Sequence, residues 1–511
     1  MKRFDSQANY LRYVIPAYAI ICMSLLVGCD KQSSQPSSDM PTEAEQPNFL
    51  LILTDDQTVD TINALGNSTI HTPNIDQIAE SGTSFTHVFN QGSWSGAVCA
   101  PSRRMINTGR HLYRTGYGPK KAEDDLHRAP LMGEVLQQAG YETFITGKWH
   151  IDNESIRRSF SLGSAIYEGG MSAKDKGGQF KPLVAEYDGN DDNPQNFMVH
   201  EGNKHSSELF IDAAIDYLDK KTSRNDNPFF MYVAFLAPHD PRQSPQEYMD
   251  MYPADAIPTP ANMLPEHPFD EGDHLIRDEV LLPYPRIPET IKPFIGEYYA
   301  MITHMDAQIG RLLDQLEASE FAENTIIIFT SDHGLAVGQH GLLGKQNQYD
   351  HSARVPFIVS GPGIPENSIK SGMFYLHSVF PTVLDLAGID IPESVDAQSI
   401  APLLNGEQDS MHSSIYGAYK NFQRMVRTDK YKLIYYPVLN RTQLFDMQQD
   451  PLEMDDLSGD PANQQLVEEL MAELEVLKQQ VGDPLINSDP VDSFAPFFTP
   501  SIMRPRPELP Q

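Results

Sequence analysis

Two pairs of polar residues stand directly after apolar runs and have the chemistry of metal ligands. Asp55 and Asp56 follow FLLILT, and Asp332 and His333 follow TIIIFTS. Carboxylate oxygens with one imidazole suit a hard divalent cation such as Ca²⁺ or Mg²⁺, whereas zinc favours His and Cys spacings that this sequence lacks. One acidic pair is most often a solvated turn, but two pairs at the ends of strands in one sheet favour a metal site.

Cys99 is a further candidate, because the other two cysteines, Cys22 and Cys29, lie in the N-terminal segment. Cys99 is part of VCAPSRRMINTGR, residues 98–110. A free cysteine is commonly a buried and inert small hydrophobe. Here the neighbouring proline, serine and two arginines are not typical of a core, so the sequence argues against an inert role.

The elements that must position these residues alternate between strand and helix. Strands are predicted in PNFLLILTDDQ, YETFITGKWH, NPFFMYVAFLAPHDP, TIIIFTSDHG and VPFIVSGPG, and helices in residues 72–81, 131–141, 206–221 and 297–319. This alternation predicts an α/β fold with a large, mainly parallel sheet flanked by helices. Ligands bind beyond the carboxyl ends of such strands, where four of these runs carry polar clusters, so the clusters are expected to converge.

Two long segments interrupt the alternation. Residues 151–205 are rich in Gly, Asp, Asn and Lys, and residues 240–293 are crowded with proline. Both exceed ordinary connection lengths, which favours functional loops or lids. Passive surface elaboration is the alternative, and the sequence leaves the choice open.

The ends of the chain differ in composition from its body. Residues 1–28 indicate a lipoprotein signal peptide, because a basic start precedes an apolar run that leads to Leu-Val-Gly-Cys at Cys29; an ordinary signal peptide or an uncleaved anchor is the alternative. Residues 29–46 predict a flexible tether, and residues 486–511 a Pro-rich tail. We expect a lipid anchor to a membrane and a location in the bacterial cell envelope, facing the periplasm or the cell exterior.

The body of the chain is expected to hold two parts. Residues 47–405 carry the alternating strands and helices together with the polar clusters. Residues 406–485 predict a smaller C-terminal α+β subdomain, in which an antiparallel meander precedes an amphipathic helix. The apolar stripe of that helix consists of Leu466, Leu470, Leu474 and Leu477.

The charge balance narrows the range of partners. The chain has 38 basic and 70 acidic residues, a net charge of −32. This excess argues against a nucleic-acid partner, which would need a basic surface. If the substrate is an anion, cations must be concentrated in the site, because the overall field repels it.

The motifs taken together match a known family. VCAPSRRMINTGR resembles the signature of the type I, formylglycine-dependent sulfatases, Cys-x-Pro-Ser-Arg followed by Thr-Gly-Arg. LTDD, GKWH, APHDP, SDHG and a lysine in GLLGKQNQYDHSARVP stand in the family's order and at about its intervals. The resemblance covers roughly residues 47–460 and implies an alkaline-phosphatase-like fold with a sulfatase catalytic domain. It also implies that a formylglycine-generating or equivalent maturation enzyme converts Cys99 to 3-oxoalanine (formylglycine).

The resemblance also implies roles for the polar residues. The hydrated aldehyde at position 99 would attack sulfur, steadied by Arg103 and Lys148, and would expel sulfate when His150 takes a proton from its second hydroxyl. His239 and Lys345 would bind sulfate and protonate the leaving alcohol. The ligands of the cation, Ca²⁺ with Mg²⁺ as the alternative, would be Asp55, Asp56, the modified Cys99, Asp332 and His333.

Two positions depart from the family pattern. Asn107 stands where leucine is usual in the signature, and His333 where asparagine is frequent. Cysteine modification in this family usually depends on the residues that are here Cys99, Pro101 and Arg103. We therefore expect modification to occur despite Asn107. Histidine can ligate through nitrogen, so the second is expected to alter metal preference slightly.

The resulting prediction is a sulfuric ester hydrolase that removes sulfate from a sulfated carbohydrate, an oligo- or polysaccharide. The expected location and the long loops suggest the carbohydrate; no motif does. Two alternatives stay open. The cation and the diol could instead hydrolyse a phosphate or phosphonate ester on the same fold, and an unmodified Cys99 would leave a non-catalytic carbohydrate-binding lipoprotein.

Overall fold

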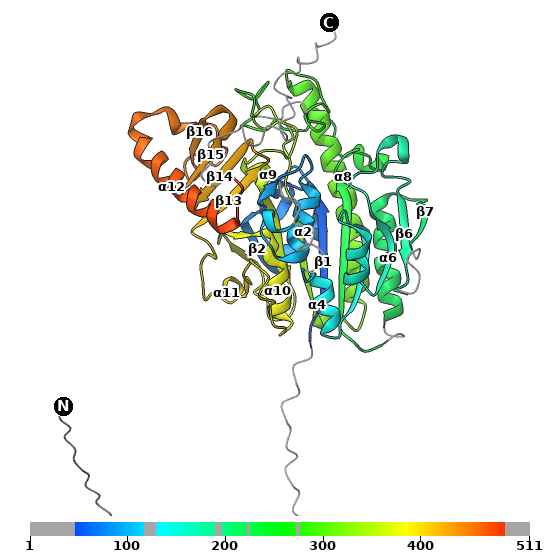
Figure 1. The fold of residues 1–511 in the computed structure, drawn as a ribbon. Helices are drawn as coiled ribbons and strands as arrows, with labels where there is room; N and C mark the ends of the chain where they lie inside the picture. Colours follow the sequence, from blue (N-terminus) through cyan, green and yellow to red (C-terminus); the bar gives the residue numbers. More distant parts are fainter. Residues whose placement is uncertain (1–45, 117–128, 190–196, 222–224, 272–275, 486–511) are drawn as a thin grey trace, which may run out of the picture. The chain divides into compact units, whose positions relative to one another are not determined.

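The computed structural model describes residues 46–116, 129–189, 197–221, 225–271 and 276–485 (Figure 1). The expected signal peptide, the tail and, apart from Gln46, the tether lie outside the described residues and stay predictions. Within the described ranges, no helix is both long enough and apolar enough to cross a membrane.

A large mixed sheet forms the centre of the fold. Its middle is a parallel set in the order β9 (Thr325–Ser331), β1 (Asn48–Asp55), β8 (Phe229–Pro238) and β4 (Glu142–Lys148). Beyond β9 the sheet continues through β10 (Arg354–Ser360), β2 (Gly82–Phe89) and β11 (Ser368–Lys370), with β12 (Phe374–Tyr375) paired to β2. Beyond β4 it continues through β5 (Leu162–Tyr167), β6 (Leu183–Tyr187) and β7 (Met198–Glu201).

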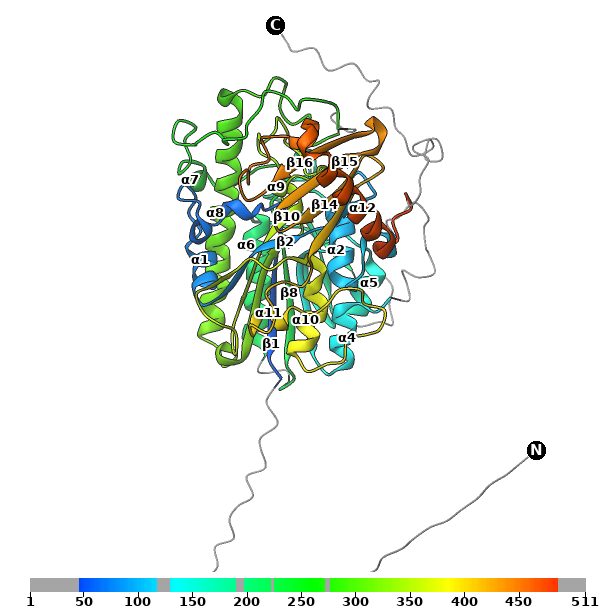
Figure 2. The same cartoon turned by 90° about the vertical axis from the view of Figure 1, so that its left-hand side faces the viewer.

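Helices cover both faces of this sheet (Figure 2), and the side chains of β1 show why. Leu50 and Ile52 pack into one buried cluster, while Phe49, Leu51 and Leu53 pack into the other. A continuous apolar run is therefore buried on both faces, which confirms the predicted α/β architecture. The first cluster includes α1 (Pro73–Glu80), α6 (Ser206–Lys221) and α8 (Pro288–Glu317); the second includes α2 (Cys99–Thr108), α4 (Met132–Gln138), α5 (Asn153–Ser159) and α10 (Val379–Leu386).

The outer strands are less regular than the sequence indicated. The predicted strand VPFIVSGPG corresponds to β10, which runs antiparallel to both β9 and β2. β2 was not predicted, because polar residues interrupt its sequence GTSFTHVF. Residues 151–205 contain α5 and the strands β5 to β7. These three strands extend the sheet, so much of the segment is regular structure rather than a loop. β7 is exposed along its whole length, so its sequence has no apolar run from which a strand could be predicted.

A smaller sheet follows, as predicted. It has the order β16 (Arg441–Asp446), β15 (Tyr431–Tyr436), β14 (Gln423–Thr428), β13 (Ser414–Tyr419) and β3 (Gly92–Ser93). The first four strands form the expected antiparallel meander, and α12 (Gln464–Val481) packs on it. Leu470, Leu474 and Leu477 of the predicted stripe are buried, while Leu466 is partly buried. The short strand β3 precedes α2 in the chain, so this sheet adjoins the segment that leads to Cys99.

Candidate active site

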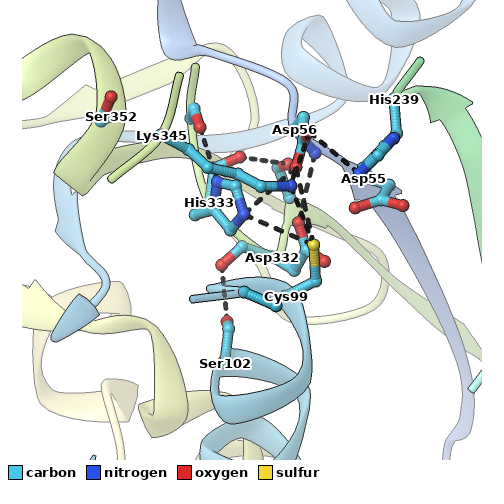
Figure 3. Close-up of polar contacts among 12 residues, drawn as sticks. Asp55, Asp56, Cys99, Ser102, His239, Asp332, His333, Lys345 and Ser352 are labelled. Atoms are coloured by element: carbon cyan, nitrogen blue, oxygen red, sulfur yellow. Dashed lines mark hydrogen bonds and ion pairs between the residues drawn. The ribbon is translucent and has the colours of Figure 1, made fainter. Parts of the chain in front are cut away.

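Strand ends and a helix start meet at one edge of the central sheet (Figure 3). Asp55 ends β1 and Lys148 ends β4, while His239 directly follows β8 and Asp332 directly follows β9. Cys99 is the first residue of α2, and its side chain points toward this edge. The structure thus brings together residues from all four polar clusters and from the cysteine segment.

Asp56 has the largest number of polar partners in this cluster. Both of its carboxylate oxygens accept hydrogen bonds from the Lys345 ammonium, at 2.7 and 2.8 Å. His333 Nε2 lies 3.1 Å from Asp56 Oδ1, and His239 Nε2 lies 3.6 Å from Asp56 Oδ2. Because all four side chains are almost completely buried, these charges interact with little screening by water.

Two site residues have backbones in the left-handed region. The φ angle is 68° at Asp56 and 59° at His150, values that non-glycine residues rarely adopt. The Asp56 N–H donates to Asp332 Oδ1 at 3.2 Å, and its carbonyl accepts from the Tyr298 hydroxyl at 2.6 Å. These bonds hold the unusual conformation, and such strain is typical of functional sites.

Two buried ion pairs lie beside Asp56. The Lys148 ammonium donates to Asp55 Oδ2, and Arg103 Nε donates to Asp332 Oδ2 at 3.0 Å. Burial, reinforced by the nearby Asp332 charge, raises the pKa of Asp55 well above its usual value. Burial acts the same way on Asp332, but Arg103, together with His333 and Lys148, holds the pKa of Asp332 below its usual value. Asp55 Oδ1 has no hydrogen-bond partner among the described residues.

The Cys99 sulfur faces these charges. Sγ accepts from Lys345 Nζ at 3.0 Å and lies 3.7 Å from His333 Nε2. Ser102 fixes the start of α2, because its hydroxyl donates a hydrogen bond to the backbone carbonyl of Asp332 at 2.5 Å. Burial alone would raise the pKa of the Cys99 thiol, but Lys148 and Lys345, together with hydrogen bonds to His150 and His239, hold it well below its usual value. The position therefore stabilises a negative charge, as a nucleophile requires.

Backbone carbonyls fix the orientation of two histidines. His239 Nδ1 donates to the Asp240 carbonyl at 2.7 Å, and His333 Nδ1 donates to the Gly334 carbonyl at 2.6 Å. In each ring Nε2 is consequently the nitrogen that faces Asp56. A neutral ring in this tautomer presents a lone pair at Nε2, which can bind a metal or accept a proton.

The donor set fits a hard divalent cation. Two sets of side chains have ligand atoms within 4.8 Å of one another: Asp55, Asp56, Cys99 and His239, and Cys99, Asp332 and His333. Together they contain every residue for which the sequence predicted a role as metal ligand. The carboxylates are buried, and Asp55 Oδ1 finds no partner in the part of the chain that the structure describes, so a cation would complete the bonding here.

An open cleft of about 330 Å³ leads to the cluster. We call Cys99, His150, His239 and Lys345 the cleft floor, and Ile276, Arg277, Asp278 and Gln346 the cleft wall. The sequence missed the wall residues: the length of the Pro-rich segment 240–293 was the signal for Ile276, Arg277 and Asp278, and proximity to Lys345 was the signal for Gln346. A separate cavity of about 480 Å³ beside α1 and α8 contains none of the predicted site residues.

Comparison with known proteins agrees with this geometry. A sulfatase family model matches residues 47–389, and the model of the C-terminal part of N-sulphoglucosamine sulphohydrolase matches residues 338–480. The N-acetylglucosamine-6-O-sulfatase of Bacteroides thetaiotaomicron is 27% identical over 86% of this chain and 88% of its own length. The ulvan-active sulfatase of Formosa agariphila is 28% identical over 93% of this chain and 88% of its own length.

A solved structure resembles the whole folded body. It shows a protein in complex with its substrate, D-glucosamine-2-N,6-O-disulfate, and is 26% identical with a TM-score of 0.72. The similarity covers 87% of this chain and 100% of the other. Because the match to the sulfatase model spans residues 47–389, and with them the entire cluster at the sheet edge, the chain belongs to the sulfatase family and is a sulfuric ester hydrolase.

Proposed function

We propose that this sulfatase releases sulfate from a sulfated carbohydrate, with formylglycine made from Cys99 as its nucleophile. The observation that carries the proposal is the meeting of Cys99 with the buried carboxylates of Asp55, Asp56 and Asp332 beside an open cleft. Similarity to an N-acetylglucosamine-6-O-sulfatase and to a protein solved with a disulfated glucosamine supports a sugar as the substrate.

The nucleophile is the hydrated aldehyde at position 99. One hydroxyl of this geminal diol attacks sulfur and gives up its proton, which overall replaces the proton that His239 gives to the ester oxygen as the sulfur–oxygen bond breaks and the alcohol leaves. His150 then takes the proton of the second hydroxyl, the aldehyde reforms and sulfate departs. Addition of water to the aldehyde regenerates the diol. Burial lowers the pKa of His150, so its imidazole is neutral and able to accept this proton at neutral pH.

The carboxylates and His333 hold the cation in this proposal. Asp55, Asp56, Asp332, His333 and the diol oxygen would be its ligands. When bound, a divalent cation polarises the sulfate and lowers the pKa of the attacking hydroxyl. We propose Ca²⁺, because Mg²⁺ usually keeps several waters and the carboxylates are too deeply buried to leave much room for them.

The basic side chains of the site have separate roles in this proposal. Arg103 and Lys148, both fully buried, steady the diol and the sulfate oxygens electrostatically. Although burial opposes it, Asp56 raises the pKa of Lys345 well above its usual value, so Lys345 stays charged and acts by binding sulfate. His239 protonates the leaving oxygen when both of its ring nitrogens carry a proton: Nδ1 donates to the Asp240 carbonyl, so the proton on Nε2 is the one that faces the site.

A panel of defined sulfated oligosaccharides tests the activity. The enzyme, produced in a host with the maturation system, is expected to release sulfate from at least one member, including sulfated glucosamines, and to turn over matched phosphate esters far more slowly. Release of phosphate alone would favour a phosphoesterase instead.

The nucleophile is tested at Cys99 itself. The mass of the peptide around Cys99 is expected to be that of formylglycine, and Cys99→Ser is expected to be inactive in a host that modifies only cysteine. Full turnover by this variant, or an unmodified thiol throughout active enzyme, would contradict the proposed nucleophile.

The envelope location is a further part of the proposal. The lipobox-like Leu-Val-Gly-Cys at Cys29 and the polar stretch after it support a lipid-anchored protein. Membrane fractions of the native host are expected to contain the wild type, and Cys29→Ala is expected to move it out of them. An unchanged distribution would argue against lipidation at Cys29.

A further inference from the structure

A group of ion pairs that the proposed chemistry does not use joins two residues of the cleft wall to Asp240 beside it. Asp240, Arg277 and Asp278 form this trio: one Arg277 Nη donates to Asp240 Oδ2, and the other pairs with Asp278 Oδ1. The Arg277 side chain is 41% exposed. Arg277 and Asp278 line the same cleft as Cys99, so a molecule whose sulfate lies over Cys99 can reach them.

Each acidic member of the trio is connected to a floor residue that handles the sulfate ester: Asp240 to His239, which protonates the leaving oxygen, and Asp278, through Gln346, to Lys345, which binds sulfate. Asp240 follows His239 in the chain, and its Oδ1 lies 3.2 Å from His239 Nδ1. Asp278 Oδ2 accepts from Gln346 Nε2 at 2.8 Å, and Gln346 follows Lys345. The trio therefore borders the side of the cleft where the alcohol half of the ester lies.

The charge of the trio limits what it can bind. Two carboxylates and one guanidinium give a net charge of one negative. Although burial opposes it, His239 and Arg277 lower the pKa of Asp240 to about 2, so this carboxylate is ionised at neutral pH. A second sulfate or a carboxylate of the substrate would meet like charge here. A neutral group that both donates and accepts hydrogen bonds would find partners of both kinds.

We propose that the trio binds ring hydroxyl groups next to the sulfate ester, so that the enzyme selects sugars whose neighbouring hydroxyl is free rather than sulfated. The inference rests on the proposed carbohydrate sulfatase function. A hydroxyl can donate to a carboxylate of Asp240 or Asp278 while it accepts from Arg277, whose five N–H donors exceed those used by the two ion pairs. A sulfate group can only accept.

A cycle of enzyme and substrate changes tests this assignment. The substrates are the best monosulfated sugar of the panel and its deoxy analogue, which lacks the hydroxyl next to the ester. We expect the wild type to favour the hydroxylated sugar by about 10- to 100-fold in kcat/KM, the effect of hydrogen bonds to charged groups. Arg277→Met is expected to reduce this preference to within about 3-fold, because the two changes remove the same interaction.

Arg311 offers a matched control. It is a surface arginine of α8 with a 46% exposed side chain, and it pairs with Asp212 at 2.7 Å and with Gln308. Arg311→Met is expected to keep the preference of the wild type. If Arg277→Met does not fold, as judged by thermal melting, Arg277→Lys replaces it; lysine keeps the charge but cannot bridge both carboxylates, and the preference is expected to fall.

Sugars with a second sulfate on the neighbouring hydroxyl complete the test. The wild type is expected to disfavour them by at least about 10-fold relative to the monosulfated sugar, and Asp278→Asn, which removes one negative charge, is expected to relax this rejection. An equal preference in wild type and Arg277→Met, or equal turnover of mono- and disulfated sugars, would overturn the inference while leaving the function intact. A wild type that releases sulfate from no sugar would overturn both.

Discussion

The floor and the wall of the cleft are built from different parts of the chain. On the floor, Cys99 and Lys345 are 2% and 5% exposed, and the charges beside them come from the ends of buried parallel strands. On the wall, Arg277 comes from the Pro-rich segment and its side chain is 41% exposed. Strand ends hold charges in fixed positions away from water, as catalysis requires, whereas the wall offers charges that a substrate can still reach. The comparison suggests that chemistry resides on the floor and selection on the wall.

The largest effect is expected from Asp56, which contacts Lys345 and His239 of the floor. Asp56→Asn keeps the shape of the side chain but removes the charge that pairs with Lys345 and His333. We expect activity to fall by at least about 1,000-fold, because an anion-binding lysine and a cation ligand are disturbed together. Sulfate release on the best substrate measures the loss.

Asp60 provides the control for Asp56. It lies a few residues further along the chain, its side chain is 66% exposed, and its ion pair with Arg354 is long at 3.8 Å. Asp60→Asn is expected to retain nearly full activity. Loss of less than about 10-fold in Asp56→Asn would show that the charge of the floor is not central to catalysis.

Removal of the cation is expected to have the next largest effect. Chelation should lower activity by at least about 100-fold and lower the melting temperature, because the carboxylates would then repel one another. Ca²⁺ is expected to restore both.

Arg277→Met should bind Ca²⁺ as the wild type does, since Arg277 contacts none of the proposed ligands. Calorimetry measures this binding. Weaker binding of Ca²⁺ by Arg277→Met would contradict the assignment of the floor to catalysis and the wall to selection.

A smaller effect is expected at the junction of wall and floor. The Glu279 carboxylate accepts from the N–H groups of Leu343 and Gly344, just before Lys345, and pairs with the fully buried Arg286. Glu279→Gln keeps the acceptor oxygen but weakens this support. We expect a loss of about 10-fold in activity, with Lys345 less firmly placed.

Glu279 also predicts a pH dependence of stability. Burial raises its pKa from 4.5 to about 7 in the folded protein, which favours the protonated form. Its contribution is therefore complete below about pH 4.5 and is lost as the pH rises toward 7. Between about pH 5 and pH 8 the wild type should lose up to about 3 kcal/mol that Glu279→Gln does not lose. Denaturant unfolding at both pH values measures the difference, and parallel curves would contradict the assignment.

The smallest effect on activity is expected in the smaller sheet. Leu474 of α12 is completely buried against β13 to β16, so Leu474→Ala should reduce the free energy of unfolding by about 3 kcal/mol. The activity of the remaining folded enzyme should be unchanged, because no atom of this cluster lines the cleft. A fall in kcat without a fall in stability would indicate that the smaller sheet takes part in the chemistry.

The sequence anticipated the floor and the charged residues around it far better than the wall. Asp55, Lys148, His239 and Asp332 follow recognisable apolar runs, and the carboxyl ends of parallel strands meet at one edge. No apolar run precedes Arg277, which is one charged residue in a proline-rich segment. Its proposed role depends on partners that lie far from it or are not recognisable as partners in the sequence. Antiparallel strands at the sheet margin were harder to predict for a related reason, because β2 and β7 lack continuous apolar runs.

Helix capping shows the same limit on a smaller scale. The pattern of residues 72–81 predicts Thr72 as the N-cap of α1, and the helix does begin at the next residue. The side-chain hydroxyl of Thr72 instead accepts a hydrogen bond from the N–H of Asn63. The N–H groups of Asn74 and Ile75 are bound by Asp306 of α8, which the sequence could not connect to α1. Local propensity located the helix start, but tertiary contacts chose the cap.

One crystallographic measurement tests the central claim most directly. Anomalous scattering from the mature enzyme crystallised with Ca²⁺ locates the ion, and the electron density from the same crystal shows the chemical state of residue 99. The account predicts a single peak bounded by Asp55, Asp56 and Asp332, with an oxygen of the hydrated aldehyde against it. A cation bound elsewhere, or an intact thiol at position 99 in active enzyme, would contradict it.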